Sequence, residues 1–441
     1  MPPQQKLAER GMAAGLRAIN WLASSDLMDR LGIRTQTERL LYNGSKTSLR
    51  VATTAGRTFQ AAQRLGKPAR QPRARRTDLF DVTPDDEQQM LSESVRDFAL
   101  ERVRPAAVAA DAGCAAPPEL LAQASELGLM MIGVPEELGG AVTERSAVTS
   151  VLMAEALSQG DAGIAVACLS AAGVSTALSL WGDADQQATY LPEFIGESPP
   201  PAAVAVLEPH ALFDPFELET TARREGEEFV LDGVKSLVPR VADDELFLVA
   251  ASLDGQPALF LVESKAAGLS VEPEPAMGLR AAATGKLILE DVRVPEGALL
   301  GEADPAVYTE CVQLGRLGWC AVSIGVGRAV LDYVKTYVND RVAFGEPISN
   351  RQAVAFMVAN IAIELEGMRL ATLRAASRVD QGLPFSREVS LAHRLCAEHG
   401  MRIGSDGVQL LGGHGYTKEH PVERWYRDLR ATGLMEGALM L

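Results

Sequence analysis

The spacing of apolar residues changes twice along this chain, and this change limits the folds open to it. Residues 81–200 and 304–441 carry apolar residues at the three- and four-residue intervals of helices. Residues 201–303 instead hold short β-rich stretches separated by Gly, Pro and Asp: 203–207, 228–238, 245–252, 258–264 and 286–294. The order predicts an α+β fold, with a helical domain over 81–200, a middle sheet or β-barrel domain over 201–303, and a helical bundle over 304–441.

Local signals place several of the helices. Thr83-Pro84-Asp85-Asp86 combines a capping Thr, a Pro at a first helical position and acids in the first turn. We expect a helix over 85–103 that ends near Pro105. In the last third of the chain, long helices are expected at about 308–341, 350–381 and 386–411.

The N-terminal extension, residues 1–80, differs from the rest in charge. It holds 15 Lys and Arg against 5 Asp and Glu, a net +10, whereas the whole chain carries −16, which leaves −26 on the remainder. The negative charge of the residues after the extension argues against nucleic-acid binding there. The basic, partly amphipathic residues 1–76 indicate either a solvated leader or a peripheral contact with an anionic membrane surface.

The five cysteines lie far apart in the sequence, without a CxxC pair or a neighbouring set of histidines. This pattern is typical of reduced, packed thiols, so we expect a cytoplasmic protein without disulfides and without a metal site.

The C-terminal tail, residues 407–441, contains the most informative residues. Gly412, Gly413 and Gly415 allow a sharp turn and the close approach of another molecule. Farther on, Glu436 is flanked by Leu434, Met435 and Gly437. Burial among apolar groups raises a carboxyl pKa, which suits a general base near neutral pH. Taken alone, these residues fit an ordinary charge near a chain end at least as well.

The phrase QLLGGHGYTKEHPVERWYRDLRATGLMEG, residues 409–437, resembles the C-terminal signature of the acyl-CoA dehydrogenases. The phrase RVAFGEPISNRQAVAFMVANIA, residues 341–362, resembles a second motif of that family, and weaker similarity extends over about 81–441. The resemblance implies a helical domain, a middle β-barrel and a C-terminal four-helix bundle.

The resemblance also implies an activity. It makes Glu436 the base that removes a proton from an acyl-CoA or acyl-carrier thioester, with FAD as hydride acceptor. The product is an α,β-double bond, and an electron-transfer flavoprotein or a similar acceptor re-oxidises the flavin. Arg316 matches a family arginine near the CoA entrance.

By the same resemblance, Arg341 and Phe344 hold the FAD diphosphate and adenosine across a subunit interface, which implies a homodimer or homotetramer. The second subunit's contribution is matched by Gln352, Gln409, Gly412 and Gly413. A guanidinium can neutralise phosphate, and glycines admit a ligand close to the backbone.

The middle domain departs from the family pattern. Leu207 replaces a threonine that helps bind flavin, and Phe213 takes the position of a serine. Leu237 and Pro239 replace the Trp and Thr or Ser that flank the flavin ring, and Pro239 can donate no hydrogen bond. These changes favour an alternative, a catalytically idle or regulatory subunit of the same fold. Because the chain stops soon after Glu436, we also expect Glu436 on a loose, exposed helix end, with a smaller pKa shift.

Overall fold

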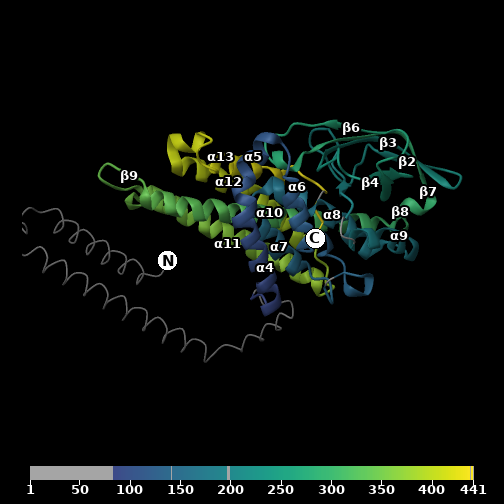
Figure 1. Cartoon of the computed structure of the whole chain (residues 1–441), viewed down its shortest axis with the longest axis horizontal. Helices are drawn as coiled ribbons and strands as arrows, with labels where there is room; N and C mark the ends of the chain where they lie inside the picture. The colour runs from purple at the N-terminus through teal and green to yellow at the C-terminus, as the bar shows by residue number, and fades with distance from the viewer. Residues whose placement is uncertain (1–82, 141, 196–198, 438, 441) are drawn as a thin grey trace, which may run out of the picture. The chain divides into compact units, whose positions relative to one another are not determined.

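The computed structural model describes residues 83–140, 142–195, 199–437 and 439–440. The chain divides into two compact units, Met1–Leu79 and Phe80–Leu441. The predicted basic extension, residues 1–80, lies outside the described residues. All elements below belong to the second unit (Figure 1).

The first helices cover the predicted region. They are α4 (Asp86–Phe98), α5 (Arg104–Gly113), α6 (Pro118–Glu126), α7 (Ala147–Ser158), α8 (Ala162–Trp181) and α9 (Ala184–Ile195). The cap of α4 is Asp85 rather than Thr83: its carboxylate accepts the Gln88 N–H at 2.8 Å, and the Gln88 side chain accepts the Asp85 N–H.

The expectation that the first helix ends near Pro105 is wrong. A π-helical turn, Ala99–Val103, follows α4, and α5 continues to Gly113. Pro105 lies in the first turn of α5, where a missing N–H is tolerated because the π-helical turn has already changed the hydrogen-bond register.

The middle region forms one eight-stranded sheet. Its strands are β1 (Ala202–Ala205), β2 (Thr221–Glu225), β3 (Glu228–Val238), β4 (Leu246–Leu253), β5 (Gln256–Glu263), β6 (Leu269–Pro273), β7 (Gly285–Pro295) and β8 (Leu299–Leu300). The hydrogen-bonded order is β6-β7-β3-β2-β4-β5-β8, and β1 pairs with β4 in parallel.

This sheet curls over a core of its own. In the hydrogen-bonded order, β3 and β5 are separated by three inter-strand spacings. In a flat sheet these two strands would lie about 14 Å apart. Nevertheless the rings of Phe229 on β3 and Phe260 on β5 are centred 5.2 Å apart. Alternate residues of β4 face this core, while Leu246 and Leu248 face a second core that includes residues of α8 and α10. The curvature is that of the expected barrel-like domain.

The last third contains α10 (Pro305–Asp340), α11 (Gln352–Asp380), α12 (Ser386–Leu411) and the short α13 (Val422–Asp428). Helices α10, α11 and α12 pack side by side, and α13 packs on α10 and α12 (Figure 1). Helix α7 joins them from the N-terminal region by packing on α10 and α11. The α+β fold with helical domains around a middle sheet is thus confirmed.

Two of the described helices, α8 and α10, have the length and the apolar composition of a membrane-spanning helix. The apolar windows of these helices are 89% and 83% buried inside the protein. Burial of this kind is what core helices of a folded domain show.

Candidate functional site

The segment that carries Glu436 is fixed to the rest of the fold on two sides. Gly437 forms an antiparallel bridge with Ala205 of β1, and its carbonyl accepts the indole N–H of Trp319 at 2.9 Å. Gly437 has a φ of 70°, and a Cβ there would lie 2.9 Å from Val206 side-chain atoms. The segment therefore needs glycine at this position to pass close to β1.

Arg316 on α10 binds both oxygens of the Glu436 carboxylate. Its Nε lies 3.0 Å from each oxygen, and its Nη2 lies 2.6 Å from Oε1. Burial raises the pKa of Glu436 above its ordinary value, Arg316 opposes that rise, and Asp214 adds to it. The result is a carboxylate that holds a proton more readily than a solvated glutamate.

The expectation of a loose, exposed helix end at Glu436 is wrong. The side chain is only 11% exposed, and the residue lies outside any helix, after a short 3₁₀ turn, Ala431–Gly433. The bridge to β1 and the hydrogen bond from Trp319 hold the neighbouring Gly437 in place.

The remaining predicted residues lie at the other end of α10 and are exposed. Arg341 follows α10, Phe344 is 95% exposed at a φ of 56°, and Gln352 begins α11. Gln409 lies in the last turn of α12, and Gly412 and Gly413 follow it. The Tyr337 hydroxyl lies 3.4 Å from Nδ1 of His414, which brings the end of α10 beside these glycines.

Arg316 and Arg341 are 25 positions apart on and just after α10, which at 1.5 Å per residue is about 38 Å. The structure therefore separates the predicted residues into two groups: Arg316 with Glu436, and Arg341 with the exposed residues. One dinucleotide cannot reach both groups within a single chain.

The exposed group fits the nucleotide half of FAD. A Cβ added at Gly412 or Gly413 would meet no described atom of the chain within 4 Å, so this open surface can receive another molecule. A nearby hollow of about 540 Å³ is lined by Arg104 and Arg341 and also by the carboxylates Asp332 and Asp340. Guanidinium groups and accessible backbone suit a diphosphate.

The region where the flavin ring is expected fits less well. The Ser236 hydroxyl donates to Glu274 at 2.9 Å, and the Leu237 N–H donates to the same carboxylate at 2.7 Å. Pro239 is buried and has no N–H. An apolar hollow of about 90 Å³ lies between Leu237 and Leu434–Met435, which is small beside the roughly 300–1,000 Å³ of common ligand sites.

A buried ion pair underlies the altered 207–214 segment. Lys235 is fully buried and donates to Glu208 at 2.7 Å, while Glu208 also accepts the N–H groups of Glu219 and Thr220. Burial lowers the pKa of Lys235 to about 8, and Glu208 opposes that change. Glu208, His210 and Glu219 lie close enough to ligate a metal ion, but the Lys235 ammonium already occupies Oε1 of Glu208.

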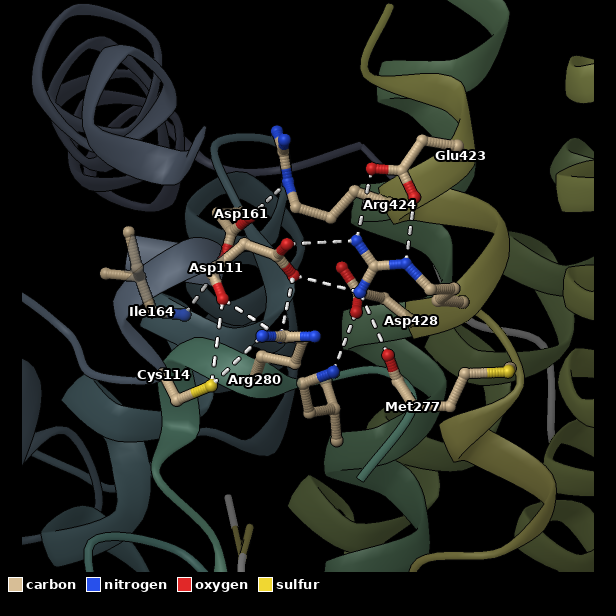
Figure 2. A network of polar contacts seen from close by, with 11 residues as sticks. Asp111, Cys114, Asp161, Ile164, Met277, Arg280, Glu423, Arg424 and Asp428 are labelled. Carbon is tan, nitrogen blue, oxygen red and sulfur yellow. Dashed lines mark hydrogen bonds and ion pairs between the residues drawn. The ribbon is translucent and has the colours of Figure 1, made fainter. Parts of the chain in front are cut away.

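A polar network that the sequence reasoning missed joins three parts of the fold (Figure 2). Arg427 of α13 binds both oxygens of Asp111 on α5, at 2.9 and 3.1 Å, and Arg424 binds Asp161, the cap of α8, at 2.9 Å. Asp428 accepts the Leu279 N–H at 2.7 Å, from the middle domain. The position of Asp161 directly before the apolar run 162–178 is a helix-capping signal that the sequence itself contains.

This network holds two walls of the apolar hollow together. Leu279 and Arg427 both line the hollow, and Arg427 also donates to the Met277 carbonyl at 2.9 Å. Burial raises the pKa of Asp428 to about 8, and the nearby Asp161 adds to that rise. Burial therefore favours the protonated form of the Asp428 carboxyl.

Comparison with known proteins gives the family. Residues 85–198, 203–292 and 306–439 match the N-terminal, middle and C-terminal domains of acyl-CoA dehydrogenase. The chain is 34% identical over 362 residues to the short-chain specific acyl-CoA dehydrogenase, mitochondrial, of Bos taurus, covering 79% of this chain and 86% of that protein. It is 31% identical over 361 residues to 3-(aryl)acrylate reductase of Clostridium sporogenes (strain ATCC 15579), covering 80% and 95%.

Among solved structures, butyryl-CoA dehydrogenase from Megasphaera elsdenii superposes with a TM-score of 0.75 at 25% identity, covering 80% of this chain and 95% of that chain. All three domain matches occur in order, and together they span most of the second compact unit. The chain belongs to the acyl-CoA dehydrogenase family of oxidoreductases.

Proposed function

We propose that this protein is an FAD-dependent dehydrogenase of an acyl thioester, with Glu436 as the general base. The observation that carries the proposal is the burial of Glu436, at 11% side-chain exposure, with a raised pKa. A base that removes a proton from carbon needs a carboxylate of higher pKa than a solvated one, held in a fixed position. Arg316 supplies the fixed position through its contacts with both oxygens.

In this proposal, the Glu436 carboxylate takes the proton from the carbon next to the thioester carbonyl. FAD, when bound, supplies the two-electron acceptor that no side chain can provide. Arg341 and Phe344 would hold its diphosphate and adenosine across a subunit interface, where the second subunit would add its own copies of Gln352, Gln409, Gly412 and Gly413. An electron-transfer flavoprotein or a similar acceptor takes the electrons onward.

The proposal requires a homo-oligomer, because the two groups of site residues are about 38 Å apart along one chain. An exposed apolar stripe on α11 supports self-association. Phe356, Ile363 and Leu370 recur every seven residues and are 59%, 67% and 42% exposed. Residues at this interval share one helix face, which a second copy can cover.

The test of the proposal is a flavin spectrum. Full-length protein is purified, incubated with FAD and freed of excess cofactor, and butyryl-CoA is then added without oxygen. We expect a bound flavin whose visible absorbance band is bleached by the thioester. Protein that retains no flavin, or a flavin band that no acyl-CoA of any chain length bleaches, would contradict the proposal.

A second candidate function is an idle or regulatory subunit that retains the fold. It is favoured by the hydrogen bonds from Ser236 and Leu237 to Glu274, which leave neither donor to the flavin ring. The same spectrum separates the two candidates, because the idle subunit would give colourless protein or a flavin that stays oxidised with every thioester.

For the basic extension we propose a peripheral contact between residues 1–76 and an anionic membrane surface, in a cytoplasmic protein. The net +10 of residues 1–80 supports it. Deletion of residues 1–76 should weaken co-sedimentation with phosphatidylserine vesicles at low salt. Equal sedimentation of both forms would contradict this contact.

A further inference from the structure

The loop formed by residues 208–219 lies between β1 and β2 and includes Asp214, whose charge acts on Glu436. Its two ends are joined through Glu208, whose carboxylate accepts the N–H groups of Glu219 at 2.7 Å and Thr220 at 2.9 Å. The buried Lys235 ammonium neutralises that carboxylate. The base of the loop is therefore fixed by a buried, hydrogen-bonded ion pair.

The outer part of the loop is attached to the beginning of α10. The buried Tyr308 hydroxyl donates to the Pro215 carbonyl, and the rings of Phe216 and Tyr308 are centred 6.0 Å apart in an edge-to-face arrangement. Within the loop, the Phe216 N–H donates to the Asp214 side chain at 3.0 Å. These contacts hold the loop against the helix that also carries Arg316.

Between these attachments, Phe213 is partly buried and its neighbour Leu212 is exposed. Phe213 packs against the core that contains Met435 and against the core that contains Tyr308 and Met440. Leu212, by contrast, is 100% exposed. Asp214, the next residue, lies near enough to Glu436 to raise its pKa. The Phe213 ring is therefore packed against two cores, one residue before an aspartate whose charge acts on the proposed base.

From this arrangement we infer that Phe213 determines the size of the acyl group that reaches Glu436. The inference rests on the proposed function, because it assumes that Glu436 meets an acyl thioester. A packed phenyl ring leaves little room for further carbon atoms, and its removal leaves a cavity that surrounding groups fill only in part. A pocket enlarged in this way gains affinity for longer apolar chains.

The experiment measures binding rather than turnover, so that it stays informative if oxidation fails. S-ethyl-CoA and S-octyl-CoA are thioethers that lack the carbonyl and cannot be dehydrogenated. Calorimetric titration of the full-length, FAD-treated protein compares the wild type with Phe213→Ala and Phe213→Leu. Thermal unfolding of each variant confirms that it is folded, and Phe213→Leu keeps most of the apolar contact if the alanine variant is unstable.

We expect Phe213→Ala to improve the affinity for S-octyl-CoA relative to S-ethyl-CoA by about tenfold or more. Phe213→Leu should shift the ratio in the same direction by less. The matched control, Leu212→Ala in the same loop, should leave the ratio at its wild-type value because that side chain is fully exposed.

An unchanged ratio in both Phe213 variants, or an equal gain for both thioethers, would overturn the inference. A shifted ratio without flavin bleaching would support the inference and overturn only the proposed oxidation. If neither the wild type nor any variant binds either thioether, the inference about Phe213 is wrong. The same result would contradict the proposal that CoA thioesters are the ligands of this protein.

Discussion

Arg316 and Glu436 form a two-oxygen contact across 120 positions of sequence, with Nε 3.0 Å from both carboxylate oxygens. Sequence similarity implies that Arg316 lies near a CoA entrance, whereas the structure places its guanidinium on the proposed base. The pair explains how one carboxylate stays buried and oriented while burial raises its pKa.

Replacement of Arg316 by Gln should raise the pKa of Glu436 further, because it removes the cation that opposes the effect of burial. A general base acts in its ionised form, so the acidic limb of the pH profile of kcat/KM should move to higher pH. Arg316→Lys keeps the charge and should move the limb less. A limb that stays at the wild-type pH in Arg316→Gln would show that Arg316 does not tune this carboxyl.

A substitution at Gly413 should weaken cofactor binding without destabilising the fold. Among the residues that the structure describes, no atom lies within 4 Å of a Cβ at this position, so Gly413→Ala should leave thermal unfolding of the FAD-free protein nearly unchanged. We expect weaker FAD binding in a fluorescence titration, because the new methyl group occupies surface that the cofactor approaches.

The matched control is Gly415→Ala. Its Cβ would lie 2.2 Å from the Val408 carbonyl oxygen, and the variant should therefore lose thermal stability. Unchanged FAD affinity in Gly413→Ala would remove this surface from the cofactor site.

Removal of Glu208 from the Glu208–Lys235 pair should destabilise the fold, because it leaves the buried Lys235 charge unpaired. Glu208→Gln should lower the free energy of unfolding by about 3–5 kcal/mol, because Lys235 then stays buried without a carboxylate. The double variant Glu208→Gln with Lys235→Met should lose less. Chemical denaturation measures both, and a double variant less stable than Glu208→Gln would show that desolvation of Lys235 is not the dominant cost.

Asp428 should make stability depend on pH. Its pKa is raised from 3.8 to about 8 by burial and by Asp161. The folded state therefore keeps a proton that the unfolded state releases, so this contribution is complete below about pH 3.8 and is lost as pH rises through about 8.

Asp428→Asn keeps the shape of the carboxyl group and cannot ionise. Its free energy of unfolding should fall less steeply between pH 4 and pH 8 than that of the wild type, measured in urea at several pH values. Parallel curves for the two proteins would mean that Asp428 is ionised in the folded state throughout.

The order of domains could be predicted from the sequence because the spacing of apolar residues reports which face of each element is buried. Strands β3, β4, β5 and β7 carry such patterns, and their predicted spans match the observed ones closely. Strands β2 and β6 could not be found this way. Most of their residues are exposed and polar, so backbone pairing to β3 and β7 holds them rather than an apolar face.

The site could be predicted only in part. Glu436 and the glycines after α12 are found from local phrases, but the partners of Glu436 come from distant positions. Arg316, Trp319 and Ala205 meet the tail only after the three regions have packed together. The expected exposure of Glu436 is wrong for this reason: it was inferred from the chain end alone, without the strand that pairs with Gly437.

The most direct test of the account compares Glu436→Gln with the wild type in one anaerobic experiment. Both proteins are loaded with FAD and mixed rapidly with butyryl-CoA, and the decay of the flavin absorbance band is followed. We predict that Glu436→Gln retains bound flavin and loses about 100- to 10,000-fold in the rate of bleaching, the usual contribution of a general base. Bleaching at the wild-type rate in Glu436→Gln would contradict the assignment of Glu436 as the base.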